Sequence, residues 1–281
     1  SMAGTSMKDI KLRIRSVEST RQITKAMQLV ATSKLRRAKE RMENSKPYAT
    51  ESREAVMAAV RSCAQQDTPF VTARPEGHRC YVVIAGERGL AGGYNSNVFK
   101  AVAAHCGGVP ACVLPIGRKA IEKYHREGAQ LLSSDYSRVE GLGVGGCYKL
   151  ANDLIKGFLD GQYSEIFLAC TSFHSMMAQE AVIEQLLPVE KTEQAEIASC
   201  TIYEPGAAET LQRIMPDFIA GRLYSALCDS FASEVAARRT AMDAATKNAD
   251  AMISDLTLKY NRARQGAITQ EITEIVAGAE E

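Results

Sequence analysis

Two stretches at opposite ends of the chain carry apolar residues at the three- and four-residue spacing of a long helix. The first, residues 13–42, contains no glycine or proline. It belongs to an apolar seam whose members share one heptad register: Ile10, Ile14, Val17, Ala31, Leu35, Ala38 and Met42. A seam of this kind cannot stay exposed to water, so it predicts a helix that packs against a partner.

The middle of this seam is interrupted. Polar residues hold the register there, namely Arg21, Thr24 and Gln28. The apolar residues are displaced to one side of them, at Ile23, Met27 and Val30. A stripe that moves sideways for two turns predicts a helix that changes partner or unwinds locally.

The C-terminal stretch, residues 207–277, has the same period as the first one and is longer. Its apolar positions also follow a heptad: Met242, Ala245, Ala249, Met252, Leu256, Tyr260, Ala263 and Ala267. Pairing of the two stripes is the economical way to bury both. We therefore predict a long antiparallel coiled coil formed by the two ends of one chain.

Between these ends the period changes to that of a sheet with helices. Short apolar runs predict strands at 80–85, 111–116 and 164–171, with a more ambiguous one at 176–187. Helices are expected at 95–106, with Asn95 or Ser96 as the N-cap, and at 118–127 and 150–159. Strands alternating with helices predict a Rossmann-like, three-layer α/β domain with a mainly parallel sheet.

The boundaries of these parts follow from proline, glycine and polar segments. The first helix should run over 7–44, break or kink at Pro47 and resume over 51–63. Residues 191–199 are predicted to be a polar loop and 201–203 an edge strand, after which Pro205 and Gly206 open the last helix, with a kink near Pro216. The expected organisation is an N-terminal coiled-coil helix over 1–65, the α/β domain over 66–205 and a C-terminal coiled-coil helix over 206–281.

Charge is concentrated in the N-terminal helix although the whole chain carries only +1. Residues 8–46 contain twelve basic and four acidic side chains, a net charge of +8, which leaves −7 for the remainder. Such a segment predicts an acidic partner surface, either protein or nucleic acid. No base-stacking aromatic residue lies between Met7 and Pro47, which argues against nucleic acid.

Candidate chemistry is sparse along the chain. Residues 141–146 satisfy G-x-G-x-x-G, but the polar residues before them do not form the buried strand that a dinucleotide site requires. The glycine-rich turn at 86–93 lacks the G-K-[ST] ending of a phosphate-binding loop, and the eight cysteines show no C-x-x-C spacing. No run of about 20 apolar residues predicts a membrane span. We expect no catalytic residue, cofactor or metal.

Four separated motifs resemble those of a known protein family. The C-terminal sequence Ile268-Thr269-x-Glu271-x-x-Glu274-x-x-x-Gly278-Ala279 resembles the signature of the F-type ATP synthase gamma subunit, bacterial type. Ile23-Thr24-Lys25-Ala26-Met27, Arg88-Gly89-Leu90-x-Gly92-Gly93 and Gln185-Leu186-Leu187-Pro188 are similar to its other motifs, in the family's order. The resemblance extends over essentially the whole chain.

The resemblance implies a central rotary shaft of F1Fo ATP synthase. The paired helices would stand inside a ring of three alpha and three beta subunits, and the α/β domain would contact the epsilon subunit and the membrane c-ring at the cytoplasmic face of the cell membrane. By resemblance, the beta-subunit contacts are Lys25, Met27, Arg264, Gln265, Thr269, Gln270 and Glu271. Arg21, Thr24 and Gln28 are then expected to face beta rather than the partner helix. The alternatives are a nucleic-acid-binding coiled-coil arm on an α/β enzyme and, less favoured, a dinucleotide-dependent enzyme.

Overall fold

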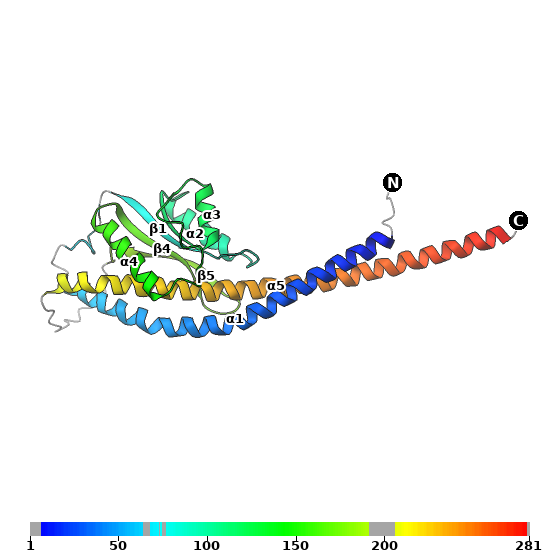
Figure 1. The fold of residues 1–281 in the computed structure, drawn as a ribbon, viewed down its shortest axis with the longest axis horizontal. Helices are drawn as coiled ribbons and strands as arrows, with labels where there is room; N and C mark the ends of the chain where they lie inside the picture. Colours follow the sequence, from blue (N-terminus) through cyan, green and yellow to red (C-terminus); the bar gives the residue numbers. More distant parts are fainter. Residues whose placement is uncertain (1–6, 64–67, 73, 75–76, 191–205, 280–281) are drawn as a thin grey trace. The chain divides into compact units, whose positions relative to one another are not determined.

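A computed structural model describes residues 7–63, 68–72, 74, 77–190 and 206–279 (Figure 1). The described chain forms two compact units. The coil unit contains the residues up to Ala31 and those from Arg239 onward, and the α/β unit contains Thr32–Arg238. Two long helices, α1 (Met7–Ser62) and α5 (Ala207–Ala279), contribute to both units.

The α/β unit is built on one five-stranded sheet. Its strands are β1 (His78–Ile84), β2 (Cys112–Ile116), β3 (Gln130–Leu131), β4 (Tyr163–Phe173) and β5 (Gln179–Leu187). They lie in the order β3-β2-β1-β4-β5, and all neighbours are parallel except β4 and β5. The mainly parallel sheet expected from the sequence is confirmed, and the ambiguous segment at 176–187 is its antiparallel edge strand.

Helices cover both faces of this sheet, which gives three layers (Figure 1). On one face α2 (Tyr94–Cys106) and α3 (Arg118–Arg126) pack against β1, β2 and β4. On the other face lie α4 (Val144–Leu159), the last turns of α1 and the first turns of α5. The Rossmann-like, three-layer α/β architecture is therefore confirmed.

The alternation of side chains along β1 explains why both faces are covered. Cys80, Val82 and Ile84 point into the core beneath α1, α4 and α5, whereas Tyr81 and Val83 point into the core beneath α2 and α3. All five residues are at most 1% exposed. A strand buried on both faces needs a continuous apolar run, and this requirement made the central strands predictable.

Of the expected break or kink at Pro47, the break is wrong, because α1 continues through this residue to Ser62. Proline removes one backbone donor, so the carbonyl of Glu43 loses its partner within the helix. Both residues lie on the exposed side of α1, where water can hydrate that carbonyl. The opposite side of the helix remains buried before and after the proline, at Met42 and Ala49. Tertiary packing thus outweighs the helix-breaking tendency of this residue.

The predicted cap of α2 is also wrong. The N-cap is Gly93, and no side chain caps the helix. The side chain of Asn95 instead organises the preceding loop: its Oδ1 accepts the N–H of Gly86 at 2.8 Å and its Nδ2 donates to the carbonyl of Arg88 at 3.3 Å. Ser96 Oγ donates to the carbonyl of Gly93 at 3.0 Å. The polar residues at this helix start are used to close a turn.

The remaining differences concern short or irregular segments. Strand β3 has two residues, too few to show a period, and the sequence did not predict it. Helix α4 contains the expected residues 150–159 and begins at Val144, where glycines obscure the first turn in the sequence. The loop expected at 191–199 and the strand expected at 201–203 lie outside the described residues. Helix α5 starts directly after Gly206 and continues through Pro216.

The tightest backbone approach in the α/β unit occurs at Gly117, between β2 and α3. Its φ is +96°, and a Cβ added there would lie 2.0 Å from the carbonyl oxygen of Ala85. We expect Gly117→Ala to lower the free energy of unfolding by about 3 kcal/mol or more, because left-handed strain adds to a backbone clash. Urea unfolding followed by circular dichroism measures the loss.

Gly143 is the matched control for this prediction. It also precedes a helix, but its φ is −86° and a Cβ there would meet nothing within 4 Å. Gly143→Ala should change the free energy of unfolding by less than about 1 kcal/mol. Equal losses in the two variants would contradict the explanation from backbone approach.

Candidate functional site

The coil unit is held together by polar contacts across its centre. Thr24 of α1 and Thr246 of α5 share a hydrogen bond of 2.8 Å between their hydroxyl oxygens, and both are less than a tenth exposed. One turn away, Gln28 Nε2 donates to Asp243 Oδ1 at 2.8 Å. Partner numbers on α5 fall as those on α1 rise, so the two helices are antiparallel, as predicted.

One turn from the threonine pair in the direction away from Gln28, Arg21 forms an ion pair with Asp250. Arg21, Thr24 and Gln28 therefore face the partner helix, and the expectation that they face another subunit is wrong. The seam is not displaced. Polar residues of α1 occupy it because α5 supplies polar partners at the same level, which satisfies groups that would otherwise be buried without hydrogen bonds.

The apolar residues that flank the polar part of the seam point away from α5. Ile23, Leu29 and Val30 are 58%, 61% and 57% exposed, and Met27 is half-buried. Ile23, Met27 and Val30 are spaced by four and three residues, so they form one stripe on the helix surface. We call these four residues the outer face of α1. An apolar stripe in water marks a surface available to a partner.

Lys25 is exposed and lies in the same turns of α1 as this outer face. Its Nζ donates to Gln28 Oε1 at 3.3 Å, so the ammonium group lies near the polar seam while remaining accessible to water. Lys25 and Met27, two of the expected contact residues, thus lie close to each other along one helix.

The other expected contact residues lie near the C-terminal end of α5. Arg264, Gln265, Thr269, Gln270 and Glu271 are all exposed. Their polar side chains bond along the helix: Thr269 Oγ1 donates to the carbonyl of Gln265 at 3.0 Å and Gln270 Nε2 to Glu274 Oε1 at 2.9 Å. Arg264 is 18 residues beyond Thr246, about 27 Å along the helix axis. The structure therefore places the expected contacts in two separate groups.

The same end of α5 carries exposed apolar residues that we did not include among the contact residues. Their exposed fractions lie between 49% and 71% at Ile268, Ile272, Ile275 and Val276. A spacing of four, three and one was the available signal, since it places all four on one side of a helix. Figure 1 shows that α5 extends past the N-terminal end of α1 in the coil unit.

One predicted seam residue of α5 is misplaced. Met252 is 43% exposed, and the neighbouring Ile253 is half-buried in its place. Met242, Ala249 and Leu256 are buried as expected. The heptad continues through Ile253 because residues at both three- and four-residue steps can reach one partner helix.

The α/β unit has a topological switch point, the place where doubly wound folds bind ligands. Strand order reverses at β1, so the crevice lies outside the carboxyl ends of β1 and β4. Side chains of α5 fill it. Ser230 Oγ accepts the N–H of Thr171 at 3.1 Å, and Ser233 Oγ donates to the carbonyl of the same residue at 3.5 Å. A Cβ on Gly86 would lie 2.9 Å from Glu234 Oε1.

Glu234 also connects α5 to the glycine-rich turn after β1. Its side chain is 6% exposed, and its Oε1 lies 2.7 Å from Arg238 Nη2. Arg238 donates in addition to the carbonyl of Gly89 at 3.3 Å. Burial raises the pKa of Glu234, and the hydrogen bond from Arg238 opposes part of that rise. The turn is thus fixed by a carboxylate and a guanidinium group.

The second glycine-rich stretch does not form a phosphate-binding turn. It leads into α4, whose N-cap is Gly143, and it follows irregular chain rather than a strand. A Cβ on Gly146 would lie 2.4 Å from Leu142 Cδ1, which indicates that this glycine serves close packing. The interpretation of residues 141–146 as a loop holds for 141–143 only, because residues 144–146 form the first turn of α4.

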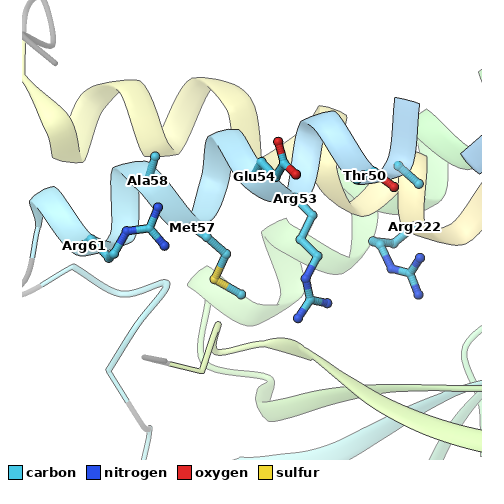
Figure 2. A pocket seen from close by; sticks show the side chains of 8 residues that line it. Thr50, Arg53, Glu54, Met57, Ala58, Arg61 and Arg222 are labelled. Carbon is cyan, nitrogen blue, oxygen red and sulfur yellow. The ribbon is translucent and has the colours of Figure 1, made fainter. Parts of the chain in front are cut away.

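An open groove of about 620 Å³ runs beside the last turns of α1 (Figure 2). It is lined by Ala49, Thr50, Arg53, Glu54, Met57, Ala58, Arg61 and Arg222. Two of its three guanidinium groups are already paired: Arg53 Nη1 lies 3.3 Å from Glu184 Oε1, and Arg222 bonds both carboxylate oxygens of the same residue. The groove therefore offers little free positive charge.

Within the described ranges, no cluster of histidine, cysteine or acidic side chains has a metal-binding arrangement. Among the helices of those ranges, none combines the length and the apolar character of a membrane span.

These features define a class of protein: a coiled-coil shaft formed by the chain ends, with a Rossmann-like domain whose ligand crevice is filled by its own helix. Comparison with known proteins agrees with that class. The family described as ATP synthase matches residues 6–281. An ATP synthase gamma chain from Ruminococcus albus is 44% identical over 275 residues, with 96% of each chain covered. The chain therefore belongs to the ATP synthase gamma chain family.

Two solved structures share the fold. A chain of the Tetrahymena thermophila mitochondrial ATP synthase central stalk and c-ring is 21% identical, with a TM-score of 0.59 over 79% of this chain and 99% of that one. A chain of the Euglena gracilis mitochondrial ATP synthase rotor is 14% identical, with a TM-score of 0.61 over 93% of this chain and 98% of that one.

The hydroxyl pair in the coil can be tested by a double-mutant cycle. We expect Thr24→Val and Thr246→Val each to reduce the stability of the coil, and their combination to cost less than the sum, with a coupling free energy of about 0.5–1.5 kcal/mol. Hydrogen exchange of the amides in residues 20–28 measures the local stability. The exposed pair Lys259 and Asp255, replaced by alanine in the same way, is the control. Additive effects at Thr24 and Thr246 would show that the hydroxyl contact contributes nothing.

The buried carboxyl group of Glu234 predicts a pH dependence of stability. Its ordinary pKa is 4.5, and the folded value is higher. The folded protein therefore keeps this proton where the unfolded chain has released it, so stability falls as pH rises from 4.5 through the folded pKa. We expect Glu234→Gln to remove that decline, as measured by urea unfolding between about pH 4 and 8. Glu51→Gln, at an exposed position of α1, should leave the pH profile unchanged; a parallel profile for Glu234→Gln would contradict the assignment.

Proposed function

We propose that this chain is the central rotor shaft of an F1Fo ATP synthase, coupling ion flow through a membrane c-ring to conformational change in a catalytic head of three alpha and three beta subunits. The observation that carries the proposal is the antiparallel pairing of the chain ends at Thr24 and Thr246. It makes a two-helix rod out of one chain. Membership of the gamma chain family supports the same role.

The dimensions of α5 suit a shaft. Its 73 residues correspond to about 110 Å of helix. A rod that presents a different side to each of three beta subunits favours a different conformation in each. Rotation then redistributes those conformations, and nucleotide affinity changes with them, because binding and conformation are linked.

The outer face of α1 is proposed to contact a beta subunit. Met27 supplies an adaptable apolar side chain, and the exposed Ile23 and Val30 extend this apolar surface. Lys25 lies about 200° around the helix from Ile23 and from Met27 and supplies a cation on another side of the same turns. A partner with an acidic and an apolar side fits these groups. Thr24 is excluded from the contact because its hydroxyl bonds to Thr246.

The second proposed contact is the exposed end of α5. It comprises Arg264, Gln265, Thr269, Gln270 and Glu271. Guanidinium and amide groups at adjacent positions can donate several hydrogen bonds to a loop of beta, and the neighbouring exposed isoleucines would pack beside them. The separation of this group from Lys25 is in keeping with contacts at two levels of one rod.

In this proposal the chain itself is not catalytic. Glu234, Ser230 and Ser233 occupy the crevice in which a Rossmann-like domain would hold a nucleotide. ATP chemistry would therefore take place in other subunits. The α/β unit would instead contact the epsilon subunit and the c-ring, which holds the chain peripherally at the cytoplasmic face of the cell membrane.

The nucleic-acid alternative loses support because the basic residues of α1 have partners within the chain. Arg21 pairs with Asp250, Lys34 lies 3.6 Å from Glu140, and Arg36 lies 3.4 Å from Glu40. Lys39 lies over the ring of Phe173, 5.2 Å from its centroid. Glu40 is already counted in the +8, so Asp250 and Glu140 offset two of the eight net positive charges, and the charge available to phosphates is reduced to that extent.

The proposal is tested in the assembled complex. We expect Arg264→Ala combined with Gln265→Ala to reduce ATP-driven ion pumping by about tenfold, because charge-assisted hydrogen bonds to beta are lost. Proton or sodium uptake by inverted vesicles measures the effect, and circular dichroism of the purified chain checks its folding. Lys259→Ala, on the same helix but outside both proposed contacts, is the control. Pumping at the wild-type rate in a fully assembled double variant would reject the contact.

A further inference from the structure

Two cysteines of the α/β unit lie directly opposite each other on adjacent strands. Cys80 of β1 pairs in register with Cys112 of β2, and both side chains belong to the core beneath α4. They are 0% and 2% exposed, and both are free thiols. Neither residue contributes to the coil or to the proposed contacts with other subunits.

The strand spacing is compatible with a covalent link. Neighbouring strands lie about 4.7–4.9 Å apart. Disulfides join residues whose Cα atoms are about 4.4–6.8 Å apart. Two cysteines that share one register position and one face of a sheet therefore meet the main distance requirement without movement of the backbone.

The pair lies at the rim of the sheet. Cys112 is the first residue of β2, and the residue before it, Ala111, is exposed. Cys80 follows His78 and Arg79, which are both exposed. Each cysteine is thus directly preceded by an exposed residue.

We propose that Cys80 and Cys112 form a dithiol site that hydrogen peroxide converts to an intramolecular disulfide linking β1 to β2. This inference does not depend on the proposed function.

The two thiols differ in their readiness to react. The hydrogen bond with Cys80 lowers the pKa of Cys112, whereas the same hydrogen bond and burial raise the pKa of Cys80 well above its usual range. Since the thiolate is the nucleophile, Cys112 is the attacking residue and Cys80 the resolving one.

The reaction balances in two steps. The Cys112 thiolate attacks one oxygen of the peroxide, the O–O bond breaks, and the departing hydroxide takes a proton to leave as water. Cys112 is then a sulfenic acid. Cys80 loses its proton as its sulfur attacks the sulfur of Cys112, the S–O bond breaks, and a second water leaves. The two sulfur atoms together have lost two electrons to the peroxide.

The test uses the full chain, reduced and folded, exposed to hydrogen peroxide, alkylated and mapped by mass spectrometry. We expect a linked peptide pair containing Cys80 and Cys112, with the loss of two hydrogen atoms. Cys112→Ser should slow the loss of the Cys80 thiol at least about tenfold. Cys80→Ser should accumulate a Cys112 sulfenic acid that dimedone captures.

Cys106 provides the matched control, because it is a half-buried thiol without a cysteine partner in register. Cys106→Ser should leave formation of the Cys80–Cys112 link unchanged. The proposal is overturned if the folded wild-type chain keeps both thiols under conditions that oxidise Cys106, or if the link forms only after urea is added. The wild-type comparison needs no variant, so a poorly folding cysteine mutant does not affect this outcome.

Discussion

The hydroxyl contact between Thr24 and Thr246 is the constraint from which the coil unit follows. Both groups are withdrawn from water, and each also lies near a carbonyl of its own helix: Thr24 Oγ1 is 3.1 Å from the oxygen of Arg21, and Thr246 Oγ1 is 2.8 Å from that of Met242. The contact across the helices adds a second partner, and only one relative position of α1 and α5 brings the two hydroxyls together. Gln28 with Asp243 adds a polar contact one turn to one side, and Arg21 with Asp250 adds a half-exposed ion pair one turn to the other. A purely apolar seam could slide by a heptad at modest cost, whereas a polar layer fixes the register. The same layer explains the outward position of Ile23 and Val30, since the seam has no place for them.

The α/β unit has a Rossmann-like fold, but the crevice in which that fold usually binds a ligand is filled. Strand order and layers are those of a nucleotide-binding architecture, yet α5 supplies Ser230, Ser233 and Glu234 to the carboxyl ends of β1 and β4. Fold alone would have suggested a ligand here, and the residues argue otherwise. Glu234 is tolerated in the interior because Arg238 lies 2.7 Å away, and Arg238 in turn bonds the turn at Gly89. In this unit the crevice is the place where helix α5 packs against the loop after β1.

The sequence allowed prediction of the features that depend on period and failed on those that depend on partners. Heptads revealed both long helices, and buried apolar runs revealed the strands with five residues or more. The break at Pro47 was wrongly predicted because nothing local shows that its face of α1 is exposed while Ala49 is buried against the rest of the unit. Arg21, Thr24 and Gln28 were assigned to the wrong side because their acceptors lie more than 200 residues away. The sequence pattern of α5 allowed the exposure of the expected contact residues on that helix to be predicted. What these residues touch depends on other chains.

The C-terminal end of α5 shows in physical terms why part of this chain depends on a partner. Thr24 pairs with Thr246, and the antiparallel register places the described start of α1, Met7, near Arg264. Beyond that point α5 continues to Ala279 with Ile268, Ile272 and Ile275 exposed by 49% to 71%, and the described residues supply no second helix to cover them. A helix in water takes most of its stability from packing an apolar side, not from intrinsic propensity. Fifteen residues of helix with an uncovered isoleucine stripe therefore require a surrounding surface, and a sleeve of other subunits around the shaft would provide one without interrupting the helix.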